Sequence, residues 1–203
     1  MNSVLTIGHS THTLSQFCAL LVEHRVTAIA DVRSTPYSAR NPQFNRDALQ
    51  ETLQDHGLAY VFLGAELGAR PASPSCYVDG RVQYTRLAST DLFQAGLARL
   101  RTGIQRYRLA LLCAEADPLQ CHRTILICRQ LKTPGLMIQH VLPSGILESQ
   151  EAAERRLLKL HNLSNAELFS GAEELLSRAY GLQEDRIAYN QRDHDRSTRV
   201  AEK

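Results

Sequence analysis

The stretch LALLCAEADPLQCHR occupies residues 109–123 and joins an apolar run to a dense group of reactive side chains. The apolar residues 109–113 predict a buried strand, and the residues from Pro118 onward predict a helix. Thiols, carboxylates, an imidazole and a guanidinium fall between residues 113 and 123. In open α/β sheets, ligands bind in the crevice outside the carboxyl ends of the strands. The stretch therefore predicts an α/β protein whose active site lies at that edge of the sheet.

An alternation of strands and helices extends on both sides of this stretch. We expect strands at residues 4–7, 28–32, 60–63, 109–113 and 137–142, with helices at residues 14–24, 45–56, 92–107 and 118–132. Strands separated by helices of this length pair in parallel through right-handed crossovers. The pattern predicts a single three-layer α/β domain, with a mostly parallel sheet of about five strands flanked by helices.

The chain after the predicted sheet changes to helices alone. With 203 residues it is short for two full domains. We expect an α/β domain with a strand-end site at residues 1–148 and a C-terminal helical extension at residues 149–190, with helices at 151–160 and 166–180. Residues 191–203 are polar and aperiodic, which predicts a flexible tail.

Composition limits the classes of function. The sequence has neither a long apolar run nor a basic segment ahead of an apolar one at its start, so we expect no membrane span and a cytoplasmic protein. Its five cysteines are irregularly spaced and odd in number, which predicts reduced thiols. The net charge of +2 is too small to indicate nucleic-acid binding by itself. Of the 23 basic residues only Lys132, Lys159 and Lys203 are lysines, so arginine, which fits carboxylates and phosphates, dominates.

Candidate site residues follow the carboxyl ends of the predicted strands, where they would gather on one edge. The candidates for catalysis are Cys113, Glu115, Cys121, His122 and His9. The candidates for ligand binding are Gly8, Ser10, Asp31, Arg33, Ser38, Arg40, Glu66 and Arg123. No residue is assigned to a metal. A further histidine, His140, lies within an apolar strand, which is more typical of a hydrogen-bonded core residue.

The helix expected after Cys113 makes Cys121 a candidate nucleophile. Asp117 fits its N-cap, Pro118 its first position, and Gln120 completes a capping box. Cys121 would then begin the second turn, where the positive helix end lowers a thiol pKa. Two alternatives remain: Cys121 is an inert buried thiol, or Cys113 is the nucleophile.

Four motifs occur in order along residues 4–145: TIGHS at 6–10, DVRSTPYS at 31–38, LGAELG at 63–68 and CAEADPLQCHR at 113–123, followed by His140. In these motifs the chain resembles the family catalogued as domain of unknown function number 488. The resemblance implies a single α/β domain with a common site. It implies no reaction.

Several known sites are excluded, since the sequence has no P-loop, no dinucleotide fingerprint and no phosphatase-type or rhodanese-type cysteine loop. The turn at residues 8–13 is the better candidate for an anion cradle, with Arg33 and Arg40 as clamps. Our leading hypothesis is an enzyme, a transferase or hydrolase, that acts on a phosphate-bearing or other anionic small ligand such as a nucleotide or modified base.

Two alternatives come from other classes. The first is a nucleic-acid-binding or nucleic-acid-repair protein, in which the long loop at residues 64–90, rich in Arg and Tyr, contacts the strand. The second is a zinc-dependent hydrolase-type site built from Cys113, Cys121 and either His122 or His9. No cofactor is otherwise predicted, and zinc is the one that the residue types allow.

Overall fold

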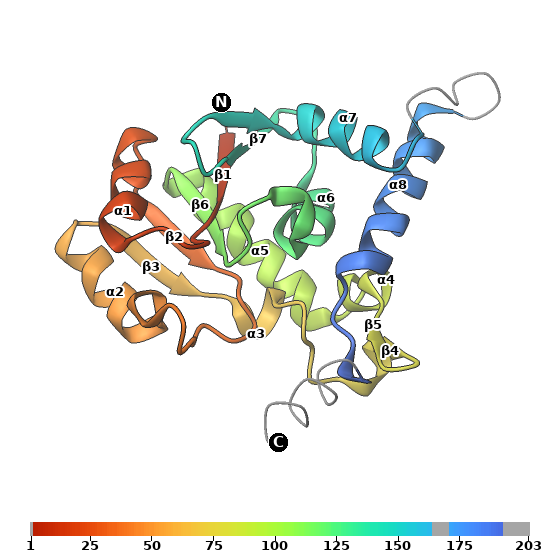
Figure 1. Cartoon of the computed structure of the whole chain (residues 1–203), viewed down its shortest axis with the longest axis horizontal. Coiled ribbons are helices and arrows are strands. Elements are labelled where there is room, and N and C mark those ends of the chain that lie inside the picture. Colours follow the sequence, from red (N-terminus) through yellow and green to blue (C-terminus); the bar gives the residue numbers. More distant parts are fainter. Residues whose placement is uncertain (1, 164–170, 193–203) are drawn as a thin grey trace.

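The computed structural model describes residues 2–163 and 171–192, and it is built around a six-stranded sheet with helices on both faces (Figure 1). The strand order is β3-β2-β6-β1-β7-β8. The strands are β1 (Asn2–Gly8), β2 (Ala28–Asp31), β3 (Ala59–Phe62), β6 (Leu109–Cys113), β7 (Leu136–Val141) and β8 (Leu147–Ser149). The first five are parallel, and only β8 runs antiparallel, against β7.

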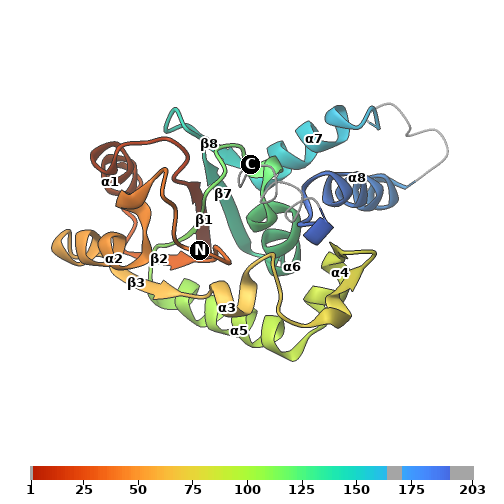
Figure 2. The ribbon, with the colours of Figure 1, turned by 60° about the horizontal axis from the view of Figure 1, so that its bottom comes forward.

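Two groups of helices cover the two faces of the sheet (Figure 2). One face carries α1 (Leu14–Glu23) and α2 (Arg46–Asp55). The other carries α5 (Asp91–Arg106), a π-helical segment (Arg123–Cys128) that continues into α6 (Arg129–Leu131), and the C-terminal helices α7 (Gln150–Leu160) and α8 (Ala172–Ile187). The C-terminal helices therefore pack on the same core as α5.

Alternation along the strands produces these two cores. In β6, Leu109 and Leu111 face the α5 side, whereas Ala110 and Leu112 face α1 and α2. A strand buried on both faces reads as a continuous apolar run, which is the pattern of residues 109–113. The predicted fold class, an α/β domain with a mostly parallel sheet, flanking helices and C-terminal helices, is confirmed.

Some predicted elements differ from the structure. The sheet has a sixth strand, β8, which is too short to show a periodicity and spans the predicted boundary between residues 148 and 149. The helix predicted at residues 166–180 is α8, which reaches Ile187. Residues 166–170 of that prediction, and the predicted tail from residue 193 onward, lie outside the described residues. No helix in the described ranges is long and apolar enough to cross a membrane.

The segment predicted as a long loop at residues 64–90 is largely folded. It contains α3 (Gly64–Leu67), a 3-10 turn (Pro74–Cys76), the hairpin of β4 (Tyr77–Val78) and β5 (Arg81–Val82), and α4 (Tyr84–Ala88). Asp79 and Gly80 form the hairpin turn with φ angles of 52° and 85°. An Asp-Gly pair is a strong hairpin signal, because both central residues of such a turn need a positive φ. The sequence therefore contained the evidence for this hairpin.

Candidate functional site

A pocket of about 460 Å³ lies at the carboxyl ends of the neighbouring strands β2, β6 and β1. Its walls include His9, Arg33, Tyr84, Cys113, Glu115 and His122. The topology brings these residues together because parallel strands all end at the same edge of a sheet. A second cavity, of about 510 Å³ and between β3 and α5, is lined by none of the predicted site residues.

The turn after β1 continues the pairing with β6 beyond the ends of both strands. The His9 N–H donates to the Cys113 carbonyl at 3.0 Å, and the Ser10 N–H to the Ala114 carbonyl at 2.8 Å. A Cβ atom on Gly8 would lie 1.7 Å from the Glu115 carbonyl oxygen, so only glycine allows this close approach. The N–H groups of His12 and Thr13 have partners as well. Four backbone N–H groups of the predicted anion cradle at residues 8–13 are therefore already used within the protein, which leaves fewer donors for an anion than the sequence suggested.

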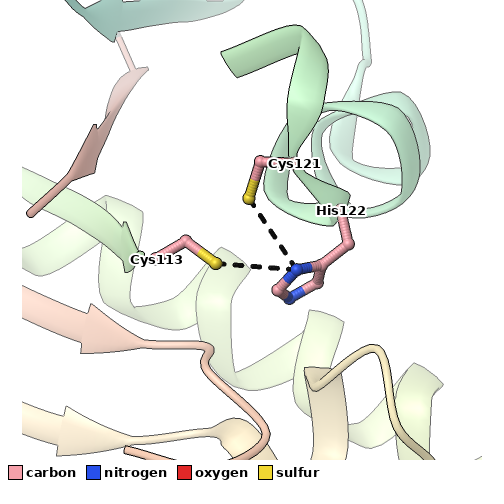
Figure 3. Close-up of side chains that lie close together, drawn as sticks. All are labelled: Cys113, Cys121 and His122. Atoms are coloured by element: carbon pink, nitrogen blue, oxygen red, sulfur yellow. Dashed lines mark hydrogen bonds between the residues drawn. The ribbon is translucent and has the colours of Figure 1, made fainter. Parts of the chain in front are cut away.

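Three side chains form a compact buried cluster beside the pocket, with Cys113 at the end of β6 and the other two, Cys121 and His122, at the start of the helical segment (Figure 3). Their ligand atoms all lie within 4.8 Å of one another. The His122 Nδ1 atom is 3.6 Å from the Cys113 Sγ and 3.8 Å from the Cys121 Sγ. We refer to these three residues as the Cys/His cluster.

The backbone at Cys121 explains how two consecutive residues join one cluster. The predicted helix at residues 118–132 is broken: a 3-10 turn (Pro118–Gln120) ends at Cys121, which is extended with φ −137° and ψ 139°. Asp117 caps this turn by accepting from the Leu119 N–H at 2.9 Å. Adjacent residues of a helix point apart, so the extended conformation is what lets Cys121 and His122 approach the same point. The prediction that Cys121 starts a second helical turn is wrong.

Hydrogen bonding fixes the tautomer of His122. Its Nε2 atom lies 3.1 Å from the Val32 carbonyl oxygen, which can only accept a hydrogen bond. Nε2 therefore carries a proton, and in the neutral ring Nδ1 directs its lone pair toward the two sulfur atoms.

The pKa values at the cluster are strongly perturbed. Burial raises the pKa of the Cys113 thiol. Burial acts in the same direction on Cys121, but the hydrogen bond with Cys113 and the charges of Arg123 and His122 outweigh it and hold the Cys121 pKa well below its ordinary value. Glu115 keeps exposed surface, yet burial of its carboxyl group and the neighbouring Cys121 raise its pKa. The cluster thus favours one thiolate, on Cys121, with a carboxyl group of raised pKa, Glu115, beside it.

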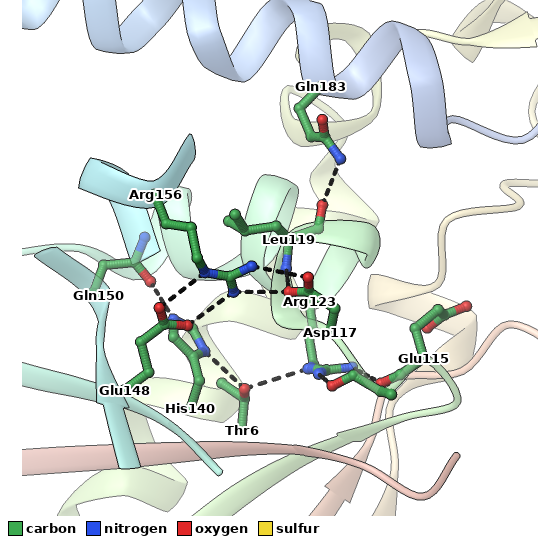
Figure 4. Close-up of polar contacts among 11 residues, drawn as sticks. Thr6, Glu115, Asp117, Leu119, Arg123, His140, Glu148, Gln150, Arg156 and Gln183 are labelled. Atoms are coloured by element: carbon green, nitrogen blue, oxygen red, sulfur yellow. Dashed lines mark hydrogen bonds and ion pairs between the residues drawn. The ribbon is translucent and has the colours of Figure 1, made fainter. Parts of the chain in front are cut away.

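Arg123, predicted to bind ligand, instead holds the loop that carries Glu115 (Figure 4). It is fully buried and lies outside the pocket lining. Its Nη1 donates to the Glu115 carbonyl at 2.7 Å, its Nη2 to the Ala116 carbonyl at 3.2 Å, and its Nε to the Thr6 hydroxyl at 3.3 Å. Arg123 is therefore a positioning residue.

The C-terminal helices hold the other end of this loop (Figure 4). Arg156 of α7 donates to both carboxylate oxygens of Asp117 at 2.8 Å and also pairs with Glu148. Gln183 of α8 donates to the Leu119 carbonyl at 2.8 Å. The helical extension thereby contributes to the geometry of the site.

Arg33 reaches the pocket in a fixed orientation. Its Nε and Nη2 donate to the Asp31 carboxylate at 2.9 and 2.6 Å, and its Nη1 donates to the Phe44 carbonyl at 2.9 Å. Asp31 is fully buried, also accepts from the Tyr60 hydroxyl, and is not part of the pocket lining. Of the predicted ligand-binding pair, Arg33 thus lines the pocket and Asp31 orients it.

Other predicted residues separate into two groups. Ser38 lines the pocket, and its hydroxyl oxygen accepts from the backbone N–H groups of Arg40 and Asn41. Gly8 and Ser10 shape the turn without lining the pocket. Arg40 is exposed outside it, and Glu66 forms an ion pair with Arg99, also outside it. The prediction that Arg40 clamps the ligand and that Glu66 binds it is not supported by these positions.

Arg70, Tyr84 and Tyr189 are among the residues of the pocket wall that were not predicted as site residues. Tyr84 is 4% exposed, and the guanidinium of Arg70 lies 4.6 Å from the centre of the Tyr189 ring. The aromatic and arginine-rich composition of residues 64–90 was a signal for the first two. Nothing in the sequence indicated that Tyr189, after α8, returns to the strand ends.

Comparison with known proteins gives a family and no further relative. The chain has no significant match among curated proteins or among solved structures. Residues 13–129, more than half of the chain, match the model of the Domain of unknown function DUF488. This range includes the Cys/His cluster, Glu115 and Arg33. The chain belongs to the DUF488 family.

Proposed function

We propose that this protein is an enzyme that binds a small anionic ligand in the strand-end pocket and acts on it with the Cys/His cluster and Glu115. The observation that carries the proposal is that Arg33 lines the pocket although only 7% of its surface is exposed. Arg33 directly follows Val32, whose carbonyl accepts the hydrogen bond from His122. A ligand bound to Arg33 would therefore lie beside the Cys/His cluster.

Arg33 keeps hydrogen-bonding capacity for a ligand. A guanidinium has five N–H groups, and the contacts with Asp31 and Phe44 use three of them. The remaining two, one on each terminal nitrogen, have no partner within the described ranges. Paired N–H groups of this kind match the oxygens of a carboxylate or phosphate. Because Asp31 already fixes the group, little ordering is required when the ligand binds.

The electrostatic environment of His9 also favours an anion. Burial and the positive charge of Arg33 lower the pKa of His9 to about 4, so the ring is neutral near pH 7. Its Nδ1 donates to the Ser10 carbonyl, which leaves Nε2 as an acceptor. Burial is the larger cause of this shift, and the charge of Arg33, its second cause, would stabilise a negative ligand. The pocket therefore offers a cationic hydrogen-bond donor, Arg33, and a neutral acceptor, His9. An anion that also carries an O–H group could bind to both.

The nucleic-acid alternative receives less support from the arginines on which it depended. Arg81 donates to the Asp185 carbonyl and Arg86 to the Ser75 carbonyl, so both tie the folded segment to its surroundings. Binding of an oligonucleotide through these residues is one outcome that the experiment below would reveal.

Calorimetric titration tests the proposal with inorganic phosphate, nucleoside monophosphates, and single- and double-stranded oligonucleotides. The informative variant is Arg33→Lys, which keeps a cation beside Asp31 but removes the paired N–H groups. We expect binding of at least one small anion, weakened by about 10- to 100-fold in Arg33→Lys. The matched control is Arg40→Lys, outside the pocket, which should bind like the unmodified protein. Binding of none of the small anions, or equal losses in the two variants, contradicts the proposal.

A further inference from the structure

We infer that Cys113, Cys121 and His122 bind one zinc ion whose remaining coordination position opens into the pocket, so that the protein is a zinc-dependent hydrolase. The class of substrate, a small anion, rests on the proposed function, whereas the metal site rests on the geometry of the cluster alone.

The two nitrogen–sulfur distances within the cluster match those of a tetrahedral zinc site. Zinc lies about 2.3 Å from thiolate sulfur and about 2.0–2.1 Å from imidazole nitrogen, so the tetrahedral angle places sulfur and nitrogen about 3.6 Å apart. The observed separations from His122 Nδ1 are 3.6 Å to Cys113 Sγ and 3.8 Å to Cys121 Sγ. Two of the three ligand separations thus already suit a zinc ion.

Hydrogen bonds to a neutral His122 satisfy this arrangement only in part. The lone pair of a neutral His122 can accept one thiol hydrogen with good geometry, yet two sulfur atoms approach it. The alternative without a metal is an imidazolium on His122 paired with a Cys121 thiolate that also accepts from Cys113. Burial opposes the imidazolium, but the charge on Cys121 helps to raise the pKa of His122 above its ordinary value, which favours this pair. The pair nevertheless places a second buried cation beside the buried Arg123. Two thiolates and a zinc ion cancel in charge, and the neutral imidazole completes three ligands. One ion therefore accounts for the convergence of all three side chains.

The surroundings of the cluster resemble the outer shell that metal sites require. The Val32 carbonyl holds the Nε2–H of His122 and thereby presents Nδ1 as the ligand atom. The backbone N–H of Arg123 donates to the Cys121 Sγ at 3.4 Å, which stabilises a thiolate. Cys113 is fixed at the end of the buried strand β6.

The cluster supplies three ligands on the wall of a pocket. No fourth histidine, cysteine, aspartate or glutamate joins the group among the described residues. Cys113 and His122 both line the pocket, as does Glu115. A zinc ion with three protein ligands keeps a position for water and lowers the pKa of that water to about 7. Zinc deaminases use the same kind of ligand set together with a carboxylate that does not bind the metal.

The hydrolytic step balances with water as the only co-reactant. Glu115 takes a proton from the zinc-bound water, and the resulting hydroxide forms a bond to the electrophilic carbon or phosphorus of the substrate. The bond to the leaving group breaks, and Glu115 returns the proton to that group. The anionic part of the substrate meanwhile rests on Arg33. Water is thus added across one bond, and no oxidant or reductant is needed.

The first test is the metal content of protein purified without chelator, measured by elemental analysis. We expect about one zinc per chain, falling well below that in Cys121→Ser and in His122→Asn. The matched control is Cys18→Ser, which removes a buried thiol from α1, far along the chain from the cluster, and should keep the zinc. Equal zinc in all four proteins, or none in any of them after zinc is added, overturns the inference.

Cobalt(II) substitution of the unmodified protein keeps the test valid even if a variant fails to fold. We expect thiolate-to-cobalt absorption and the intense visible bands of a tetrahedral site. An open position predicts that added phosphate or azide changes the visible bands. If neither anion changes the visible bands, the site has no open position and the proposed hydrolase activity is contradicted. If thiolate-to-cobalt absorption is absent, the metal site itself is contradicted.

The outcomes separate this inference from the proposed function. Zinc binding without any affinity for small anions would contradict the proposed function and leave the metal site intact. Anion binding by a metal-free protein that takes up neither zinc nor cobalt, with Cys121 reacting rapidly with alkylating agents near neutral pH, would instead make the cluster a nucleophilic thiol site.

Discussion

His140 and His122 are both buried histidines, but their ring nitrogens differ in the number of hydrogen-bonding partners. This difference separates a structural residue from a candidate metal ligand. Each ring nitrogen of His140 has one partner, the Thr6 hydroxyl at 2.9 Å and the Gln150 side-chain oxygen at 3.0 Å. His122 has one satisfied nitrogen, while the other faces two sulfur atoms. Burial is common to both, so the number of partners at each nitrogen is the informative quantity.

The contacts around His140 form a chain in which the donors run in one direction (Figure 4). Arg123 donates to Thr6, Thr6 to His140, and His140 to Gln150, whose amide donates to the Tyr180 hydroxyl. Every member has a partner, which is what makes a buried polar network stabilising. We therefore expect changes in this chain to lower the free energy of unfolding, and changes in the Cys/His cluster to alter metal and ligand binding.

Arg123 belongs to both regions, and its replacement should have the largest effect on stability. In Arg123→Met the part-buried carbonyls of Glu115 and Ala116 lose their donor, and even a fully buried carbonyl without a partner costs only about 1–3 kcal/mol. We expect the free energy of unfolding to fall by up to about 6 kcal/mol in urea titrations. A loss below about 0.5 kcal/mol, typical of surface substitutions, would show that Arg123 does not hold the loop.

The next effect is a dependence of stability on pH that comes from His140. Burial, together with the charge of Arg123, lowers the pKa of His140 from 6.5 to about 4. The unfolded chain therefore binds this proton at a higher pH than the folded chain does. The contribution is complete above pH 6.5 and is lost as the pH falls from about 6.5 to about 4, by on the order of 3 kcal/mol.

His140→Gln isolates this contribution, since the other histidines remain in both proteins. We expect the difference in unfolding free energy between the unmodified protein and His140→Gln to decrease as the pH falls from 7 to 4. Parallel curves over this range would mean that His140 titrates at its ordinary pKa and is not the desolvated core residue described here.

The smallest effect concerns Arg156, which links α7 to the loop of the site. Its guanidinium is 40% exposed, and partly exposed ion pairs contribute about 1 kcal/mol or less, reduced by salt. Arg156→Gln should therefore lower the unfolding free energy only slightly, and the effect should shrink further at high ionic strength. The neighbouring Arg155→Gln, an exposed position, serves as control. If the two variants are equal at low salt, the pairs with Asp117 and Glu148 contribute nothing.

The fold was predictable because its signals are local and repeated. The apolar runs of β1, β2 and β6 are largely buried on both faces, β7 is buried around His140, and the helices between them carry clear periodicity. The position of His140 in such a run also predicted a core residue. The three residues of β8 carry no periodicity, so that strand could not be recognised.

The site was predictable only as far as strand ends determine it. Cys113, Glu115, His9 and Arg33 were found because each follows a strand. The extended backbone at Cys121 was not predicted, since the apolar spacing of residues 118–132 resembles one continuous helix; Cys121 and His122 come together only in the zinc alternative. Zinc ranked below a free thiol because the spacing C-x7-C-H at residues 113–122 matches no standard zinc motif.

The most direct test of the difference between the two histidines is nitrogen-15 NMR of histidine-labelled protein, before and after a chelator is added. The account predicts that His122 has a protonated Nε2 and a metal-bound Nδ1 whose resonance moves when the chelator removes zinc, while both nitrogens of His140 stay unchanged. A His122 ring that carries both protons and does not respond to chelator or added zinc would contradict the zinc site and favour a thiolate–imidazolium pair.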